Sequence, residues 1–302
     1  MIIFSVFKTC AGQDEIVVGA EQPTVYLPLL KDKKVGLVVN NTSMVGDVHL
    51  VDFLIDNEVD VRKIFAPEHG FRGDISAGGE VKDGLDEATG LPVFSLYGET
   101  RKPTADHLNG LDLIIFDIQD VGCRFYTYIS TLHLVIEACA ENSLPLVVFD
   151  RPNPNGDYVA GPIRKVGFES FVSMDPIPIV HGCTVGELAE MINGEGWHEA
   201  SKSCELKVIP VKDYDHTMSY SLPVRPSPNL PNDLAIRLYP SLCFFEATSV
   251  SVGRGTEFPF QVLGGPNPEL GNFEFTPHSI PGVSINPLNK DQKCYGIDLR
   301  NL

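Results

Sequence analysis

The sequence predicts an α/β protein in which a Rossmann-like parallel-sheet domain precedes a smaller, mostly β auxiliary domain. Through the first half of the chain, apolar segments rich in β-branched residues alternate with segments of helical spacing. The strand-like segments are apolar throughout, which is typical of parallel strands buried on both faces. Beyond about residue 163 the chain becomes rich in proline turns and short β-like pieces. We therefore expect domains at 1–162 and 163–302.

The individual elements follow in order along the chain. Strands are expected at 34–41, 61–68, 91–98 and 111–120, within 144–156, and again at 204–214. Helices are expected at 47–57, 125–142 and 184–193. In the last of these helices, Thr184 and Glu187 have the spacing of a capping box.

Composition excludes several classes of partner. The 302 residues include 23 Lys and Arg against 40 Asp and Glu, giving a formal charge of −17. Such a chain repels nucleic-acid phosphates and anionic membrane surfaces, so we expect no nucleic-acid partner. No run approaches the roughly 20 apolar residues of a membrane span.

Known cofactor and metal motifs are absent from the sequence. After the first expected strand the chain reads "NNTSMVGD", and neither GxGxxG nor GxxxxGK[ST] occurs. The 7 cysteines include no CxxC pair, which argues against structural zinc and against a disulfide framework. We therefore expect no cofactor and no metal.

Acidic residues gather where the expected strands end. Glu68 follows one strand, Asp117 and Asp120 another, and Asp150 a third. Ligands of open parallel sheets bind outside the carboxyl ends of the strands, so these acids should converge on one crevice. The same segments carry further polar and charged side chains: His69, Arg72, Arg124, Tyr126, Arg151 and Asn153.

Several of these residues also have a purely structural interpretation. Asp150 and Asn153 are suited to capping a turn, and Asp117 to being a buried, hydrogen-bonded acid. His181, after "PIPIV", fits a structural histidine as well as a site residue. Glu68 resists this interpretation best, because it lies beyond its strand with a proline before it and no helix to stabilise.

Converging carboxylates suggest either a metal site or a glycosidase-like acid/base pair. The spacings HxH and HExxH are absent. Arginines among the acids fit an anionic organic substrate better than a metal cation, because guanidinium groups bind carboxylates in a bidentate manner. The residues alone therefore indicate hydrolysis of an acid-bearing sugar or a similar molecule.

Longer motifs resemble a known family. The segments are "FAPEHGFRGDISAG", "TGLPVFSLYGETRKPT", "LDLIIFDIQDVGCRFYTYISTL" and "VVFDRPNPNG", followed by "IPIVHGCTVGELAEMIN", "PSPNLP" and "SVGRGTEFPF". In this order they resemble the exo-β-N-acetylmuramidases of the NamZ type, a family of bacterial peptidoglycan hexosaminidases. The resemblance runs from about residue 34 to beyond residue 260.

The resemblance implies an active site in the cleft between the two domains and the release of N-acetylmuramic acid from the non-reducing ends of peptidoglycan fragments. That sugar carries a lactyl carboxylate, which would explain the arginines among the acids. Arg72, Arg124 or Arg151 is expected to contact this carboxylate. Glu68 is the candidate catalytic acid. The other catalytic candidates are His69, Asp117 and Asp120. The substrate-binding candidates are Arg72, Arg124, Tyr126, Asp150, Arg151, Asn153, His181 and Arg254.

The sequence departs from the family pattern in places. Ala247 and Ser249 stand where the family usually has Gly and Asn, and members usually continue well past the equivalent of Leu302. The auxiliary domain is therefore either truncated at its C-terminus or naturally short in this member. Two other functions stay open: a non-catalytic protein that binds peptidoglycan fragments, and a metal-dependent hydrolase using Glu68, His69, Asp117 and Asp120.

The start of the chain, "MIIFSVFKTCAGQ", has a brief apolar stretch followed by small residues. Together with the implied substrate, this predicts an exported protein of the periplasm or cell envelope.

Overall fold

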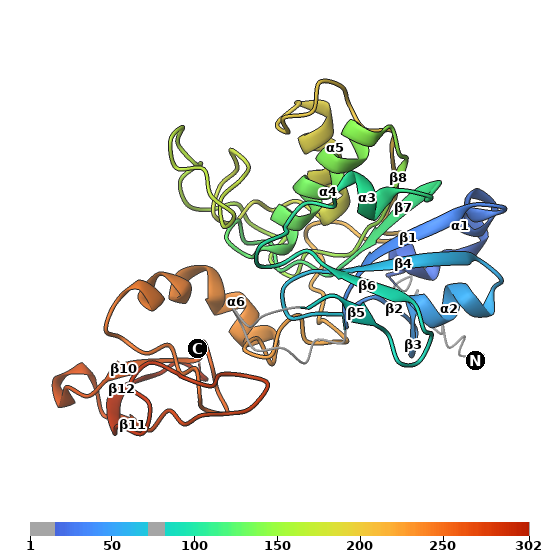
Figure 1. Ribbon diagram of the computed structural model, residues 1–302. Coiled ribbons are helices and arrows are strands. Elements are labelled where there is room, and N and C mark those ends of the chain that lie inside the picture. The colour runs from blue at the N-terminus through green and yellow to red at the C-terminus, as the bar shows by residue number, and fades with distance from the viewer. Residues whose placement is uncertain (1–15, 72–81, 302) are drawn as a thin grey trace, which may run out of the picture.

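The computed structural model describes residues 16–71 and 82–301 (Figure 1). The amino-terminal segment that suggests export, and Arg72 with the residues up to 81, lie outside the described residues. Within the described part, no helix is both long enough and apolar enough to span a membrane.

A seven-stranded sheet forms the centre of the larger unit, in the order β5-β6-β4-β1-β7-β8-β9. The parallel strands are β1 (Lys34–Val39), β4 (Asp60–Ala66), β6 (Pro92–Ser95), β7 (Leu113–Asp117), β8 (Leu146–Phe149) and β9 (Leu206–Ile209). The short strand β5 (Gly84–Leu85) joins antiparallel at one edge. Taken in chain order, the parallel strands lie 3-2-1-4-5-6, the Rossmann arrangement, with its switch point between β1 and β7.

Both faces of this sheet are covered, which explains why its strands are apolar throughout. Helices α1 (Pro23–Leu30) and α2 (Leu50–Asp56) pack on one face, in a core that includes Leu37, Ile115 and Val147. Helices α4 (Tyr128–Asn142) and α5 (Val185–Gly194) pack on the other, with Val38, Phe116 and Val148. Alternate residues of one strand thus enter opposite cores. The expected α/β class is confirmed.

Shorter elements connect this framework. They are the 3-10 turn η1 (Gly19–Glu21), the hairpin of β2 (Met44–Val45) and β3 (Val48–His49), and helix α3 (Ala105–Leu108). The expected helix at 47–57 therefore begins later, because its first residues pair as a strand. The expected capping box is present in α5: the Thr184 hydroxyl accepts from the Glu187 amide, and the Glu187 side chain from the Thr184 amide.

A smaller unit follows in the carboxyl-terminal part of the chain. It contains α6 (Asp233–Leu242), η2 (Cys243–Ala247), β10 (Val262–Gly265), η3 (Pro268–Leu270), β11 (Phe273–Phe275) and β12 (Cys294–Asp298). Its three strands form an antiparallel sheet in the order β10-β12-β11. Figure 1 shows this unit, in orange and red, extending from one side of the larger sheet.

The structure divides the chain later than the sequence suggested. Strand β9 lies well past residue 162, yet it pairs with β8 and completes the large sheet. Helix α6 was also not expected, because Pro240 and the preceding prolines look like turn signals. The side chain of Asn232 accepts from the Ala235 amide and begins this helix. We place the division between the units near α6.

Asn155 links the two units. This fully buried side chain donates from Nδ2 to the carbonyl oxygens of Val121 (2.9 Å) and of Ile236 in α6 (3.2 Å). These two hydrogen bonds hold α6, the first helix of the smaller unit, against the loop that follows β7.

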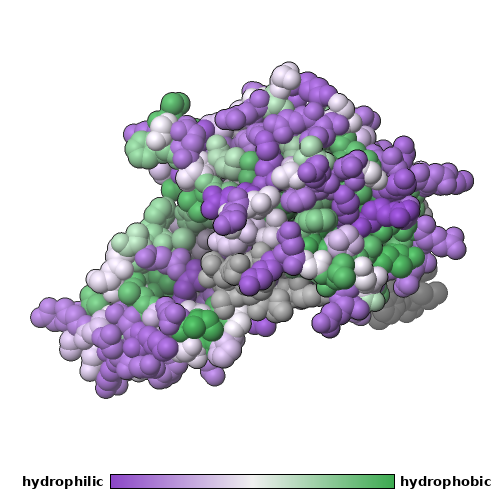
Figure 2. Space-filling model, viewed as in Figure 1, coloured by the Kyte–Doolittle hydropathy of each residue, from purple (hydrophilic) through white to green (hydrophobic). Residues whose placement is uncertain are grey.

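Between β8 and α5 the chain extends as a long arm, residues 157–180, visible in yellow-green in Figure 1. Arg124 fastens its base, donating from Nη1 to the carbonyl oxygens of Pro162 (2.8 Å) and Ile177 (2.5 Å). Figure 2 shows hydrophobic surface at the tip of the arm. The exposed apolar side chains of the arm are Val159, Ile163, Val166, Phe168 and Val172.

Candidate active site

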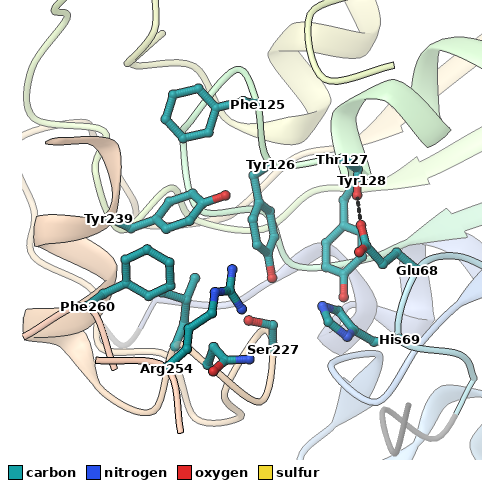
Figure 3. A pocket seen from close by; sticks show the side chains of 12 residues that line it. Glu68, His69, Phe125, Tyr126, Thr127, Tyr128, Ser227, Tyr239, Arg254 and Phe260 are labelled. Atoms are coloured by element: carbon teal, nitrogen blue, oxygen red, sulfur yellow. Dashed lines mark hydrogen bonds between the residues drawn. The ribbon is translucent and has the colours of Figure 1, made fainter. Parts of the chain in front are cut away.

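A pocket of about 430 Å³ lies between the larger and smaller units, beyond the carboxyl ends of β4 and β7 (Figure 3). Its walls come from four segments: the turn after β4, the segment leading into α4, the loop before α6, and the smaller unit. The lining residues are Glu68, His69, Phe125, Tyr126, Thr127, Tyr128, Ser227, Asn229, Leu230, Tyr239, Arg254 and Phe260. The position agrees with the general rule for open parallel sheets.

The turn after β4 presents Glu68 to the pocket. Pro67 follows the last strand residue, His69 and Gly70 both have left-handed backbone angles (φ 70° and 77°), and the Gly70 amide donates to the Pro67 carbonyl (3.0 Å). A left-handed residue other than glycine is uncommon and often marks a functional turn. This reversal holds Glu68 beyond the strand, half-buried, instead of continuing the ladder.

Two hydroxyl groups orient the Glu68 carboxylate. Thr127 Oγ1 donates to Glu68 Oε2 (2.7 Å) (Figure 3), and the hydroxyl of Tyr97 is also hydrogen-bonded to Glu68. Burial, followed by the negative charge of Glu68, raises the pKa of Tyr97 to about 12. Tyr97 therefore stays protonated and can act as a donor to this carboxylate.

Aromatic rings form the deep wall of the pocket. Tyr126 contacts Tyr128 edge-on (centroids 4.9 Å apart) and Tyr239 (5.8 Å), and Tyr239 contacts Phe260 (5.0 Å). All four side chains are buried. Such contacts fix the rings in place, so the pocket has a rigid apolar wall suited to the face of a sugar ring.

Arg254 brings a positive charge to this wall. Its guanidinium lies over the Phe260 ring (5.0 Å) and pairs with Glu246 through Nε and through Nη2 (3.2 Å). Burial opposes its charge, but Glu246 raises the pKa of Arg254 overall. Figure 3 shows the guanidinium pointing toward Ser227 and the Tyr126 hydroxyl. Arg254 is the one arginine among the described lining residues.

Asp117 and Arg151 do not line the pocket. Arg151 donates to both carboxylate oxygens of Asp117, from Nε (2.5 Å) and Nη2 (2.9 Å), and also from Nη2 to the Met44 carbonyl (3.1 Å). Both side chains are buried, Asp117 completely. These contacts match the structural interpretation of Asp117. They direct Arg151 away from a substrate, in contrast to its expected role.

Asp150 and Asn153 are likewise engaged inside the protein. Asp150 Oδ1 accepts from the amide of Gly186 (2.7 Å), and Oδ2 accepts from the Thr184 hydroxyl (2.9 Å), so the carboxylate holds the first turn of α5. A Cβ on Gly186 would lie 2.6 Å from Asp150 Cγ, so glycine is needed there. Asn153 Oδ1 accepts from the Asn155 amide (2.8 Å) in a turn. Neither residue lines the pocket.

Asp120 and His181 lie together behind the tyrosines. His181 Nδ1 accepts from the Cys183 amide (3.2 Å), so the neutral ring carries its proton on Nε2, which faces Asp120 Oδ2 at 3.5 Å. The negative charge of Asp120 adds to burial in raising the pKa of Tyr126 and of Tyr128. Asp120 is thus close to the pocket wall without lining it.

The catalytic and binding candidates therefore separate into two groups. The structure brings Glu68, His69, Tyr126 and Arg254 together in the pocket. It places Asp117, Asp120, Arg124, Asp150, Arg151, Asn153 and His181 in supporting positions around it. The strand-end acids do lie at one edge of the sheet, but Glu68 is the one carboxylate among the described residues that line the pocket.

Sequence reasoning did not single out Ser227, Asn229, Tyr239 and Phe260. Ser227 and Asn229 belong to "PSPNLP" and Phe260 to "SVGRGTEFPF", two segments of the family resemblance in which these residues were given no role. Tyr239 comes from α6, a helix that was not expected. Asn229 donates from Nδ2 to the Val283 carbonyl (3.0 Å), while its buried Oδ1 has no hydrogen-bond partner among the described residues. This oxygen is an acceptor available to a ligand N–H or O–H group.

Metal ligands are not clustered in the described residues. Among positions 16–71 and 82–301, no group of three or more His, Cys, Asp or Glu side chains is arranged to hold a metal ion. Asp117 and Asp120, two acids of the metal alternative, engage Arg151 and the Gly122 amide instead.

A carboxylate at the mouth of a rigid aromatic pocket, between a Rossmann-like unit and a small β unit, defines the protein as an α/β enzyme of the glycoside hydrolase type. Comparison with known proteins makes this specific. Residues 35–234 match the family model "Exo-beta-N-acetylmuramidase NamZ, N-terminal", and residues 237–302 match its C-terminal counterpart. The chain belongs to the NamZ exo-β-N-acetylmuramidase family. The two models also meet near α6, where the structure divides.

Individual relatives agree with this assignment. The chain is 42% identical over 294 residues to the peptidoglycan β-N-acetylmuramidase NamZ of Bacillus subtilis, covering 91% of this chain and 69% of that protein. A crystal structure of a DUF1343 family protein from Bacteroides fragilis has a TM-score of 0.88 at 49% identity, covering 95% of this chain and 77% of that one. A second protein of that family and organism has a TM-score of 0.82 at 33% identity, with coverages of 94% and 76%.

The buried ion pair should matter more for stability than an exposed pair does. Arg151→Met leaves the fully buried Asp117 carboxylate without its partner, so we expect a loss of about 3–5 kcal/mol in the free energy of unfolding. Replacing both residues, as Asp117→Leu with Arg151→Met, should recover part of this loss because no unpaired charge remains. As a control, Arg62→Met breaks the exposed Asp60 pair and should cost less than about 1 kcal/mol. Urea unfolding of the four proteins measures this, and equal effects at Arg62 and Arg151 would contradict it.

Asp150 should make stability depend on pH. Burial raises the pKa of Asp150 to about 6, above the value of about 4 in the unfolded chain. The folded state therefore holds the proton longer, and the contribution that is complete below pH ~4 is lost as the pH rises through about 6. In Asp150→Asn this component disappears. The difference in unfolding free energy between variant and wild type should shift in favour of the variant by on the order of 2 kcal/mol between pH ~4 and ~7. Parallel urea-unfolding profiles across this range would exclude such a role for Asp150.

Proposed function

We propose that the protein is an exo-acting glycoside hydrolase that releases N-acetylmuramic acid from the non-reducing ends of peptidoglycan fragments. The observation that carries the proposal is the position of Glu68: its oriented carboxylate stands at a pocket that also contains a guanidinium and an aromatic wall. Family membership supports the same reaction, and the B. subtilis relative is named as a peptidoglycan β-N-acetylmuramidase.

Glu68 is proposed as the general acid that protonates the leaving oxygen. A general acid must be fixed within hydrogen-bond reach of the group that it protonates. The hydroxyls of Thr127 and Tyr97 supply this orientation from two directions, and the turn at His69 and Gly70 fixes the backbone. Besides the general acid, glycosidases commonly use a second protein side chain, either as a nucleophile that attacks the sugar or as a base that activates water. Among the described lining residues, His69 is the best placed for this role, since Figure 3 shows its ring beside Tyr128 and close to Glu68.

Arg254 is proposed to bind the lactyl carboxylate of N-acetylmuramic acid. Glu246 engages its Nε and Nη2, which leaves Nη1 of this pocket-lining residue for a further carboxylate. Arginine suits this purpose, because its planar group can bind one carboxylate while stacked on a ring such as Phe260. Asn229 Oδ1, an acceptor without a partner among the described residues, is a candidate contact for the acetamido N–H.

The shape of the site supports action at a chain end. Tyr239 and Phe260 close the pocket opposite Glu68, so a single terminal sugar fits beyond the scissile bond more readily than a continuing chain. We further propose that the protein acts after export, in the periplasm or cell envelope, and serves cell wall recycling, since peptidoglycan is the proposed substrate.

Removing the proton of Glu68 tests the catalytic role. Glu68→Gln keeps the shape and the Thr127 contact, so binding should survive while turnover of the disaccharide N-acetylmuramyl-β-1,4-N-acetylglucosamine falls by roughly 100-fold or more. Release of N-acetylmuramic acid is measured by chromatography, with Glu190→Gln on the exposed face of α5 as the matched control. Near-normal turnover by Glu68→Gln would remove Glu68 from the role.

The same assay with a chelator tests the metal-dependent alternative, which predicts that activity is lost and is restored by a divalent ion. A wild type that binds the sugar but does not release N-acetylmuramic acid would favour the non-catalytic alternative.

Substitution of Arg254 tests recognition of the lactyl group. Arg254→Gln should lower kcat/KM for 4-nitrophenyl β-N-acetylmuraminide by about tenfold or more, because a charge-assisted hydrogen bond to the carboxylate is lost. The corresponding N-acetylglucosaminide lacks the carboxylate, so any slow hydrolysis of it should change little. Glu246→Gln is the control, since it frees the guanidinium without removing it. Equal losses on both glycosides would assign Arg254 a structural task.

A further inference from the structure

We propose that a groove between α4 and the arm binds the saccharide on the leaving-group side of the scissile bond, and that Arg101 contacts a lactyl carboxylate of that saccharide. This inference rests on the proposed function and extends it to the part of the substrate that the pocket does not hold. The groove encloses about 930 Å³ of space open to solvent, lined on one side by His133 and Glu137 of α4 and on the other by Phe171 and Arg164 of the arm.

Side-chain contacts connect the active-site pocket with the groove. Tyr97, which is hydrogen-bonded to Glu68, lies with its ring 6.3 Å from that of Phe171. Phe171 lines the groove, and Arg101 lies beside it with Cζ 4.4 Å from the ring centroid. A chain of side-chain contacts thus leads from the proposed catalytic acid to the groove. Helix α4 follows the same direction, because Thr127 and Tyr128 at its start line the pocket and His133 and Glu137 line the groove.

The Arg101 guanidinium packs on the Phe171 ring but forms no ion pair with a carboxylate among the described residues. Most other described arginines pair with carboxylates: Arg62, Arg151, Arg164, Arg237, Arg254 and Arg300. Arg101 is exposed and has no ion pair within the described part of the chain. In a protein with a formal charge of −17, an unneutralised guanidinium packed on an aromatic ring beside a groove is suited to an anionic ligand.

Several charged side chains that line the groove are already engaged within the protein. His133 Nδ1 lies 2.7 Å from Asp175 Oδ1, which ties α4 to the arm. Glu137 accepts from Lys102 Nζ (2.6 Å) and from the Glu199 amide (3.0 Å). A third groove residue, Glu169, pairs with Arg164. These contacts are made within the protein, so the groove is formed in advance of binding. Arg101 remains the available cation of its described lining, which also includes the exposed Glu199.

The chemistry of the groove fits a second N-acetylmuramic acid. Phe171 and Trp197 offer apolar surface for sugar rings, and Arg101 offers a bidentate donor for a carboxylate. In an alternating glycan the first sugar beyond the scissile bond is N-acetylglucosamine, which is uncharged, and the next carries the lactyl carboxylate. The groove should therefore favour substrates of at least three sugars.

Substrates of different length test the proposal. For Arg101→Gln we expect kcat/KM to fall about tenfold on the peptide-free tetrasaccharide (N-acetylmuramyl-N-acetylglucosamine)₂ and less than about twofold on 4-nitrophenyl β-N-acetylmuraminide. Phe171→Ala should have the same selectivity. Lys165→Gln, a charge change on the exposed arm away from the groove lining, is the matched control. Equal losses on both substrates, or no loss on either, would overturn the proposal.

Direct binding separates this proposal from the proposed function. Calorimetry of wild type and Arg101→Gln with N-acetylglucosaminyl-β-1,4-N-acetylmuramic acid, the leaving-side disaccharide, should show binding that weakens about tenfold in the variant. If wild type hydrolyses neither substrate but this difference persists, the proposed function fails and the groove stands. If wild type is active but the disaccharide does not bind, or binds both proteins equally, the groove proposal fails and the function stands.

Discussion

The ion pair of Asp117 and Arg151 organises the end of the sheet on which the pocket depends. Asp117 ends β7, Arg151 directly follows β8, and Met44, whose carbonyl Arg151 also contacts, follows β1. The hydroxyl of Ser43 donates to the Asp117 carbonyl as well. One pair thus joins the segments that leave the sheet on both sides of its switch point. A bidentate arginine is needed here, because burying the carboxylate alone would be costly.

Around this ion pair, the residues that stabilise the fold differ from the residues proposed to contact the substrate. Asp150 holds the start of α5, Arg124 the base of the arm, and Asp120 a position behind the tyrosines. Their hydrogen bonds are used within the protein. Glu68 and Arg254 instead reach the pocket at the ends of a turn and a loop, each oriented by one or two neighbouring side chains. Precise placement of reacting groups requires such a supporting layer.

Sequence patterns predicted the large sheet well because burial on both faces leaves a strong signal: segments such as 111–120 are apolar throughout. Glu68 could be singled out because proline and glycine isolate it from any regular element. The role of Arg151 was not predictable, since a guanidinium that binds a substrate and one that binds Asp117 look alike in sequence. Tyr239 and Phe260 were missed because they reach the pocket only through the packing of α6 and the smaller unit. Pro240 concealed α6 for a similar reason: it disfavours a helix locally, and the buried face of the helix overrides it.

The division of the pocket between two units has a thermodynamic consequence. Neither the sheet unit, which supplies Glu68, nor the smaller unit, which supplies Arg254, presents a complete site by itself. A bound sugar therefore contributes free energy only when both units are folded and docked, with Asn155 holding α6 against the end of the sheet. Occupied protein should consequently unfold as a single cooperative body, whereas in the empty protein the smaller unit is held by its own interface alone.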